Sequence, residues 1–509
     1  ARRERVRQVD AADGLRPRRV PRAPDRRRPA GAGGRRGGLQ RDRRDPRTPP
    51  ATGAELTPAE EKEREMTQLA DAPRPETAEP AEVVRALVAR ARAAMEAYEN
   101  TDQARVDEAV TALAWAIYKP EHARRLAELA VEDTGLGNVE SKVIKNTRKT
   151  FGTLRDLMRA KTVGVIAEEP ERGLVKYGKP VGVVGAVCPS TNPAATPVNK
   201  AMMALKGGNA VIIAPSPAGA ATTGRTVELM RAELAKAGHP EDLVQVLPPP
   251  VSKDSTQALM EQCDLAVVTG SQNNVKRAMQ SGTVTIGVGA GNVPVVIDES
   301  ADLDDAAAKI CASKIFDNAT SCSSENEVVI LDAVYEAAMA ALERAGGWRC
   351  SAEEKTRVAE TLWQGGKLNR RVIAKDPDVT AEVMGLAPEA RRAKFFMVEE
   401  DRVGGRNGFA DEKLSLVLTV YRARHFEDAK RICREILNVT GKGHSVGIHT
   451  KDMARARDLA AHTDVVRVLV NQAHTFGNGG SFENCLPFTL SMGGGTWAGN
   501  TISENLNYR

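Results

Sequence analysis

Aromatic residues are scarce in this 509-residue sequence, where phenylalanine, tryptophan and tyrosine together make up 4%. No run approaches the roughly 18 consecutive apolar residues of a membrane-spanning helix. No basic start followed by an apolar stretch and a cleavage site marks a secretory signal either. With 41% hydrophobic and 27% charged residues, the composition is typical of a globular protein of two or three domains. We therefore predict a cytoplasmic protein with no membrane partner.

Signals for disulfide or metal chemistry are also weak. The seven cysteines are odd in number and scattered, without a CxxC pair, which argues against both a disulfide framework and a zinc site. The seven histidines form no HExxH pattern, and His444 and His449 lie five residues apart, a spacing that does not align ligands on one helix face. We therefore expect no metal ion.

Lysine is missing from the first 50 residues, which contain 17 arginines and six acidic residues. The net charge of +5 comes from this segment, and the rest of the chain is mildly acidic. A segment rich in arginine, proline and glycine buries too little apolar surface to fold. It is a nucleic-acid-binding arm, a disordered extension, or a wrongly assigned start, with translation beginning at Met66. We favour the last interpretation, treat residues 1–80 as an extension, and expect no nucleic-acid partner.

Apolar residues recur at spacings of three and four between residues 80 and 130, which predicts helices. From residue 173 onward, apolar runs typical of buried strands alternate with helical patterns. The predicted strands cover 173–189 (two runs joined at 178–180), 209–215, 243–248, 265–271 and 284–291, and the predicted helices cover 196–207, 224–238, 255–262 and 272–281. After residue 322 the predicted strands are 325–332, 415–423, 444–450 and 465–473, with a helix at 335–345. This alternation predicts two α/β domains with a cleft between them, whose ligands bind beyond the carboxyl ends of parallel strands.

The stretch FDNATSCSSENEVVI (316–330) places Cys322 among small hydroxyl residues, directly before a predicted strand. A thiolate at such a position can attack a carbonyl carbon, provided that its pKa is lowered or that a base lies nearby. A small buried cysteine without a chemical role is the more frequent fate of a single thiol. The residues around Cys322 leave both interpretations open.

Six stretches of the chain occur in the same order as the sequence blocks of a known family. They read VCPSTNPAATPVNKAM, VVTGS, GVGAGNVPVVID, NATSCSSEN, DEKLSLVLTVYRA and TLSMGGGTWAGNTISEN. Over about residues 82–509 the sequence resembles the aldehyde dehydrogenase superfamily, in its CoA-acylating branch, and within that branch it is most similar to the acylating sulfoacetaldehyde dehydrogenases. The resemblance implies an aldehyde dehydrogenase-like fold with a Rossmann-type cofactor domain (81–315), an α/β catalytic domain (316–470), and a segment (471–509) that returns to the cofactor domain and contributes to interdomain or subunit contacts.

The resemblance also assigns roles to individual residues. Cys322 aligns with the family's nucleophile. Asn192 aligns with the asparagine that stabilises the oxyanion together with the backbone N–H of Cys322, and without the resemblance a turn residue before Pro193 is an equally good interpretation. His444 matches a histidine of the acylating branch that would assist CoA, and a structural histidine is nearly as well supported. The residues expected to bind the nicotinamide cofactor are Pro189, Ser190, Thr191, Ala214, Pro215, Ser216, Thr269, Gly270, Ser271, Gly289 and Glu412.

One departure from the family pattern concerns the acceptor of the acyl group. Hydrolytic members carry a general-base glutamate where this chain has Gly287. Release of a thioester to water needs such a base, whereas the thiol of CoA is already partly ionised at neutral pH and is a better nucleophile. A second departure is Ala214, which stands where hydrolytic members usually have lysine, and it leaves the choice between NAD and NADP open.

The implied reaction is the oxidation of sulfoacetaldehyde with NAD(P)+ and CoA to sulfoacetyl-CoA through a thioester on Cys322. The alternatives are another short aldehyde (acetaldehyde, propionaldehyde or succinic semialdehyde) and a hydrolytic dehydrogenase. The glycine-rich stretch HTFGNGGSFEN (474–484) is a candidate lining for a sulfonate, or simply a flexible loop. The resemblance further implies a homo-oligomer, either a dimer or a tetramer.

Overall fold

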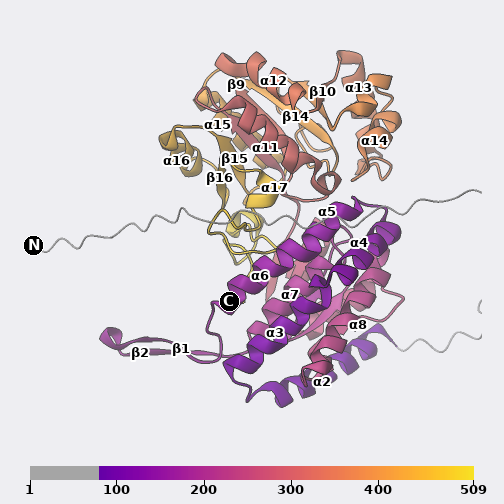
Figure 1. Cartoon of the computed structure of the whole chain (residues 1–509), viewed down its shortest axis with the longest axis vertical. Helices are drawn as coiled ribbons and strands as arrows, with labels where there is room; N and C mark the ends of the chain where they lie inside the picture. The colour runs from indigo at the N-terminus through magenta and orange to yellow at the C-terminus, as the bar shows by residue number, and fades with distance from the viewer. Residues whose placement is uncertain (1–78, 509) are drawn as a thin grey trace, which may run out of the picture. The chain divides into compact units, whose positions relative to one another are not determined.

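The computed structural model describes residues 79–508. The predicted extension at 1–80, with Met66, lies outside the described residues apart from its last two positions. The predicted alternation of strands and helices is confirmed, and it produces two parallel sheets with helices on their faces (Figure 1).

The first sheet has five parallel strands in the order β5-β4-β3-β6-β7. Its strands are β3 (Val183–Val187), β4 (Ala210–Ala214), β5 (Val244–Val246), β6 (Leu265–Thr269) and β7 (Thr285–Val288). All residues of β3, β4 and β7 are buried, as the apolar runs predicted for strands covered on both faces. The order reverses between β3 and β6, and this reversal is where parallel sheets bind their ligands.

The helices of this part of the chain pack on the sheet or on one another, and several of them lie in front of it in Figure 1. They are α2 (Pro80–Tyr98), α3 (Gln103–Tyr118), α4 (Pro120–Thr134), α7 (Ala195–Lys206), α8 (Ala220–Lys236), α9 (Lys253–Gln262) and α10 (Gln272–Gln280). Local signals set their ends: Asp102 caps α3 by accepting from the N–H of Arg105, and Gly135 ends α4 in the left-handed conformation that favours glycine. The residues of α7 are all buried, because this helix lies between the sheet and α3.

The second sheet has seven parallel strands in the order β10-β13-β14-β9-β8-β15-β16. The strands are β8 (Val293–Ile297), β9 (Glu325–Leu331), β10 (Gly347–Arg349), β13 (Phe395–Glu400), β14 (Val417–Ala423), β15 (Val446–His449) and β16 (Val468–Val470). The surrounding helices are α11 (Leu303–Ile315), α12 (Tyr335–Arg344), α13 (Ala352–Leu362), α14 (Pro377–Val383), α15 (Phe426–Val439), α16 (Met453–Ala461) and α17 (His474–Gly477). The chain changes sheets between β7 and β8, earlier than the expected domain boundary after residue 315, and the division into domains stays a prediction.

Two further features complete the fold. A helical rod runs through α5 (Val139–Ile144), the π-helical turn η1 (Lys145–Lys149) and α6 (Thr150–Met158). It is followed by a hairpin of β1 (Gly164–Glu169) and β2 (Leu174–Gly178), which projects from the body in Figure 1. The first of the two strand runs predicted within 173–189 therefore pairs with β1 in the hairpin, and only the second joins the sheet. Within residues 79–508, no helix is both long and apolar enough to cross a membrane.

Candidate active site

Cys322 lies on a loop that is bent tightly before β9, the middle strand of the seven-stranded sheet. Asp317, Asn318 and Ala319 have φ values of 49°, 53° and 60°, so three consecutive residues with a Cβ adopt the left-handed region. Each such residue costs about 1–3 kcal/mol and persists only where its surroundings hold it in place. The loop is therefore a strained segment whose shape depends on its contacts.

The carboxylate of Asp317 provides many of these contacts. It accepts hydrogen bonds from the backbone N–H of Asn138 (2.9 Å), the hydroxyl of Thr320 (2.8 Å) and the ammonium groups of Lys142 (3.1 Å) and Lys145 (2.6 Å). Burial alone would raise the pKa of Asp317, but the two lysines hold it below its ordinary value. Because Asp317, Thr320 and both lysines are buried, the loop before Cys322 is held against the rod by a desolvated ionic network.

The thiol of Cys322 is partly buried and lies between charges of opposite sign. Burial and the nearby carboxylate of Glu412 raise its pKa to about 12, and the guanidinium of Arg467 acts in the opposite direction. Gly291 packs directly against it: a Cβ at Gly291 would lie 2.2 Å from the carbonyl oxygen and 2.8 Å from the Cβ of Cys322. Only glycine fits this approach, which brings the segment after β7 against the thiol.

Glu412, predicted to bind the cofactor, reaches the same place. Its carboxylate accepts a hydrogen bond from the N–H of Gly291 at 3.1 Å. Burial raises the pKa of Glu412 to about 8, Asp411 adds to this shift, and the hydrogen bond from Gly291 opposes it. The structure therefore brings Cys322, Gly291 and Glu412 together.

Arg467 is a buried cation whose described hydrogen bonds go to neutral acceptors. It donates to the side chains of Asn478 (3.0 Å) and Asn505 (3.2 Å) and to the carbonyls of His444 (3.0 Å) and Gly493 (2.7 Å). Burial lowers its pKa to about 10, while the potential negative charge of Cys322 raises it. Asn478 continues this network by donating to the hydroxyl of Ser323, the residue after Cys322. Arg467 thus supplies positive charge close to the thiol.

His444 is buried at the end of a chain of polar groups. Its Nδ1 lies 2.8 Å from the hydroxyl of Ser445, which lies 2.8 Å from Nε2 of His474. The backbone N–H of His474 donates to Glu325. The Nε2 atom of His444 is buried and has no hydrogen-bond partner among the described residues. Burial, Arg467 and His474 keep the pKa of His444 well below its ordinary value, so its imidazole is neutral near pH 7.

Asn192 precedes α7, on the turn that follows β3. The carbonyl of its neighbour Thr191 accepts a hydrogen bond from Lys142 at 3.1 Å. Because Lys142 also bonds Asp317, this lysine connects the Asn192 turn to the Cys322 loop. The role of Asn192 toward an oxyanion stays a prediction that this arrangement favours.

The other predicted cofactor residues lie at one edge of the five-stranded sheet, in the last positions of β4 and β6 or directly after β3, β4, β6 and β7. Two cavities open at this edge. One of about 920 Å³ is lined by Pro215 and α8 residues and the other, of about 470 Å³, by Gly289, His444 and the first residues of α10. At Gly270, an added Cβ would meet no atom within 4 Å, and the hydroxyl of Ser216 is buried without a described partner. Open backbone and an unpaired hydroxyl fit a nucleotide cofactor at this edge.

Gly287 lies in β7, and its carbonyl accepts a hydrogen bond from Asn500 at 2.6 Å. A Cβ at this position would lie 2.6 Å from Cγ1 of Val275 on α10. The chain therefore has neither a carboxylate at position 287 nor room for one unless α10 moves.

Sequence reasoning missed Arg467 and the three lysines Lys142, Lys145 and Lys149. Arginine within the apolar run VVRVLV predicts only a strand, and nothing local shows that its side chain points to Cys322. A signal for the lysines was present, because positions 142, 145 and 149 fall on one face of a helix. Lysine is rarely fully buried unless paired, so a helix face of this kind would ordinarily be assigned to the solvent side.

Comparison with known proteins is consistent with this geometry. Residues 67–352 match the aldehyde dehydrogenase family. The chain is 52% identical over 430 residues to an acylating sulfoacetaldehyde dehydrogenase of Cupriavidus necator, a match that covers 84% of this chain and 87% of the relative. An acetylating aldehyde dehydrogenase from Geobacillus thermoglucosidasius has a similar structure, with a TM-score of 0.82 and 34% identity over 86% of this chain and 96% of that one.

A third protein, a propionaldehyde dehydrogenase from Rhodopseudomonas palustris solved with bound propionyl-CoA, has a TM-score of 0.73 and 25% identity, and the match covers 83% of this chain and 92% of that chain. The chain belongs to the aldehyde dehydrogenase family. Its fold is the α/β fold of that family, as predicted.

Proposed function

We propose that this protein is a CoA-acylating aldehyde dehydrogenase that oxidises sulfoacetaldehyde to sulfoacetyl-CoA with NAD(P)+. The observation that carries the proposal is the position of Cys322, which packs against Gly291 at the edge where the strands of the cofactor-type sheet end. The similarity to the acylating sulfoacetaldehyde dehydrogenase of C. necator supports the choice of substrate.

Cys322 is the nucleophile that attacks the aldehyde carbon and forms a thiohemiacetal. Arg467 favours the thiolate, because a nearby cation stabilises the negative charge of the sulfur. The side-chain amide of Asn192 and the backbone N–H of Cys322 donate hydrogen bonds to the oxygen of the adduct, where charge develops. Loss of hydride leaves an acyl group in thioester linkage to Cys322.

The nicotinamide cofactor and CoA accept the hydride and the acyl group respectively when they are bound. The residues that hold the cofactor are those after β3, β4, β6 and β7, together with Glu412. The Nε2 atom of His444 belongs to a neutral imidazole at the cavity of about 470 Å³. In the tautomer with an unprotonated Nε2, it accepts a hydrogen bond from the thiol of CoA and so positions that thiol.

Hydrolysis of the thioester is the competing activity. It needs a base that prepares water, and Gly287 offers none, with Val275 filling the space beside it. Transfer to CoA needs no such base, because the thiol itself is an effective nucleophile toward a thioester.

The test is an assay of NAD(P)H formation with sulfoacetaldehyde, acetaldehyde, propionaldehyde and succinic semialdehyde, each with and without CoA. We expect the highest kcat/KM for sulfoacetaldehyde and little turnover without CoA. Replacing Cys322 with Ala is expected to abolish acyl-CoA formation, at least a 10³-fold loss, because no other group can carry the acyl chain. Acyl-CoA formation by the alanine variant would rule out this mechanism.

We also propose that the protein works in the cytoplasm as a homo-oligomer. The hairpin supports the proposal of a homo-oligomer, because its residues Val175 and Tyr177 have 52% and 62% of their surface exposed. Exposed apolar groups on a projecting strand are typical of a contact between subunits.

A further inference from the structure

The helical rod α5–η1–α6 turns an unusual face toward the interior of the protein. Its buried side carries Lys142, Lys145, Asn146, Thr150 and Thr153, where an ordinary buried helix would carry apolar residues. The rod also contains a π-helical turn at Lys145–Lys149, a rare element that occurs mostly at functional sites. A polar, cationic face at this place calls for an explanation other than packing.

The charges on this face do not balance. Lys142 and Lys145 are 2% and 4% exposed, and both bond the single carboxylate of Asp317. Lys149, one turn further, is partly buried and has no carboxylate partner among the described residues. Its ammonium donates only to carbonyls, those of Gly480 (2.9 Å), Gly479 (3.2 Å) and Phe476 (3.5 Å). Buried charge is costly unless it is paired, so this face can accept an anion.

Both lysines of the π-turn lie beside the segments that flank Cys322. Lys145 donates to the hydroxyl of Thr320, two residues before Cys322, at 3.0 Å. Lys149 bonds the carbonyls just after Asn478, the residue that donates to Ser323. The two cations therefore contact the two segments that flank Cys322 in the fold.

The surplus of positive charge also affects Lys149 itself. Burial, Arg148 and Lys145 lower its pKa to about 7. An anion bound beside Lys149 would oppose all three effects, since it would pair with the ammonium and neutralise the two neighbouring cations.

From this geometry we infer that Lys145 and Lys149 bind the anionic group of the substrate, and thereby select a sulfonated aldehyde over a neutral one. This inference rests on the proposed function and names the part of the same site that recognises the substrate. In sulfoacetaldehyde a single methylene separates the sulfonate from the aldehyde carbon, so the sulfonate must bind close to the sulfur of Cys322. The sulfonate oxygens would replace the more distant carbonyls, those of Gly479 (3.2 Å) and Phe476 (3.5 Å), as acceptors of the Lys149 ammonium.

The plainer interpretation is that Lys149 only fastens the 476–480 segment through its carbonyls. The two interpretations differ in what a neutral substitution does. If Lys149 only holds this segment in place, its loss impairs the oxidation of every aldehyde alike. If it binds an anion, its loss impairs the oxidation of sulfonated aldehydes selectively.

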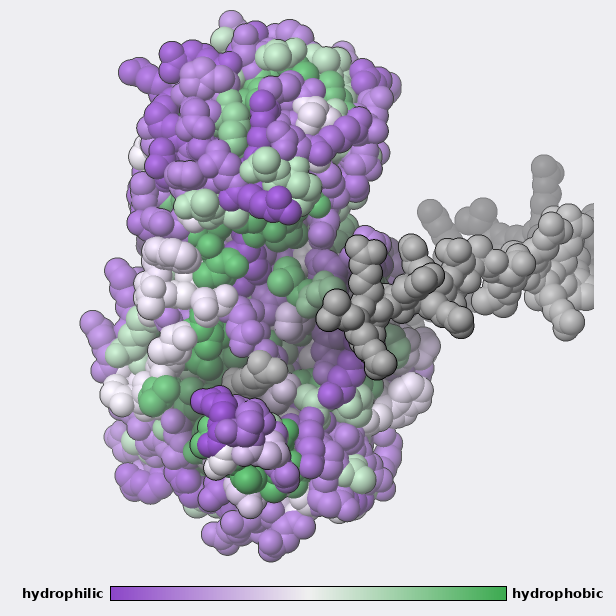
Figure 2. Space-filling model, turned by 90° about the vertical axis from the view of Figure 1, so that its left-hand side faces the viewer, coloured by the Kyte–Doolittle hydropathy of each residue, from purple (hydrophilic) through white to green (hydrophobic). Residues whose placement is uncertain are grey.

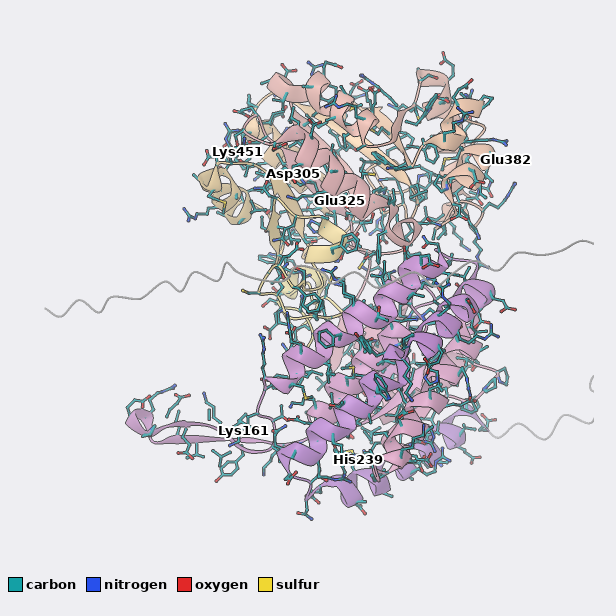
Figure 3. The ribbon with its side chains drawn as sticks, viewed as in Figure 1. Lys161, His239, Asp305, Glu325, Glu382 and Lys451 are labelled. Carbon is teal, nitrogen blue, oxygen red and sulfur yellow. The ribbon has the colours of Figure 1, made fainter. Side chains whose placement is uncertain are left out.

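The experiment compares the wild-type enzyme with Lys149→Met and Lys149→Arg, with CoA and NAD(P)+ present. The control is Lys161→Met, an exposed lysine that follows the rod at the base of the hairpin (Figure 3). The measured quantity is the ratio of kcat/KM for sulfoacetaldehyde to kcat/KM for propionaldehyde. We expect Lys149→Met to lower this ratio at least tenfold, Lys149→Arg to keep most of it because the charge remains, and Lys161→Met to leave it unchanged. An unchanged ratio in a folded Lys149→Met variant would overturn the inference.

A second measurement does not depend on sulfoacetaldehyde being the substrate. Ethanesulfonate is tested as an inhibitor of propionaldehyde oxidation, beside propionate and the uncharged ethyl methyl sulfone. We expect ethanesulfonate to inhibit the wild-type enzyme and the sulfone not to, and the inhibition constant to rise at least tenfold in Lys149→Met. Equal inhibition by ethanesulfonate and the sulfone overturns the inference even if Lys149→Met does not fold. Stronger inhibition by propionate than by ethanesulfonate also overturns it, because the site would then prefer carboxylates. Failure of the proposed function looks different: sulfoacetaldehyde is not oxidised although ethanesulfonate still inhibits.

Discussion

Cys322 is influenced by two charged residues that act on its thiol in opposite directions. Arg467 favours the thiolate and Glu412 disfavours it. Because a thiol reacts as its thiolate, the rate at which iodoacetamide modifies Cys322 reports this balance directly. With a thiol pKa of about 12 in the protein alone, the rate should rise about tenfold per pH unit between pH 7 and 10.

We predict that Arg467→Gln lowers the alkylation rate of Cys322 at every pH in this range, at least threefold, because the cation that stabilises the thiolate is lost. The measurement is the pH profile of alkylation in a Cys485→Ser background, since Cys485 is an exposed thiol that would also react. Arg467→Lys is the matched control that keeps the charge. A Gln variant with the wild-type profile would show that Arg467 acts only through its hydrogen bonds.

The opposite change is expected for Glu412→Gln, which removes a negative charge and should accelerate alkylation. Because the pKa of Glu412 is raised to about 8, its carboxylate is charged mainly above that pH. The acceleration should therefore be small at pH 7 and grow as the pH rises through 8. An effect that is the same at all pH values would contradict this assignment of charge.

Among these residues, only those in a recognisable block could be predicted from the sequence. Cys322, Asn192 and Glu412 stand in such blocks, and the structure places Cys322 and Glu412 together. Arg467 could not be predicted, because it is far from Cys322 in sequence and because Asn478 and Asn505 bond its side chain only when the chain folds.

At the scale of elements, the loop before β9 depends on the rod beside it. The strained residues 317–319 are held mainly through Asp317, whose carboxylate is completely buried between Lys142 and Lys145. Gly137 makes this approach possible, because a Cβ there would lie 1.9 Å from the carboxylate. The rod and the loop therefore form one structural unit, held by buried charges.

We predict that Asp317→Asn lowers the free energy of unfolding by about 3–5 kcal/mol, because it leaves two buried ammonium groups without a counter-charge. Urea denaturation followed by circular dichroism measures this loss. The matched control is Glu140→Gln on the same rod, which breaks the exposed ion pair with Arg124 and should cost about 0–1 kcal/mol. Equal losses in the two variants would show that the buried network is not stabilising.

The difference in stability between wild type and Asp317→Asn also depends on pH. The pKa of Asp317 is lower in the folded protein than in the unfolded chain. Its contribution to stability is therefore complete above the unfolded value, about pH 4, and is lost as the pH falls through the lower folded value. The difference in stability between wild type and Asp317→Asn should shrink only below about pH 4.

The elements themselves were largely predictable, because apolar runs and helical spacing follow from burial. The rod was harder to interpret, since its interior face is polar and its lysines resemble a solvated surface. The hairpin was also missed. The residues at 174–178 have the composition of a strand, but composition does not show whether that strand pairs with β1 or joins the five-stranded sheet.

At the scale of the whole molecule, the two sheets meet where the chain passes from β7 to β8, and this passage contains Gly291, the glycine against Cys322. The edge of one sheet that we propose to bind the cofactor and the Cys322 loop of the other are thus joined by a few residues. Such an arrangement explains why the site consists of residues from distant parts of the sequence.

The exposed apolar surface suggests contacts beyond a single chain. On the side shown in Figure 2, hydrophobic side chains gather over the middle and lower part of the molecule, while the upper part is mostly hydrophilic. On β2, Val175 and Tyr177 share one face of the strand and are more than half exposed. A second copy of the chain would bury this face.

We therefore predict that the double variant Val175→Glu, Tyr177→Glu lowers the mass of the particle in solution, from a dimer or tetramer toward smaller species. Charges placed on a buried contact oppose association, because they lose their hydration without gaining partners. Size-exclusion chromatography with light scattering measures the mass. The control is Lys176→Gln, which changes the residue between them on the opposite face of the same strand. A double variant with the wild-type mass, or a wild-type protein that is already monomeric, would show that this face of the hairpin does not join subunits.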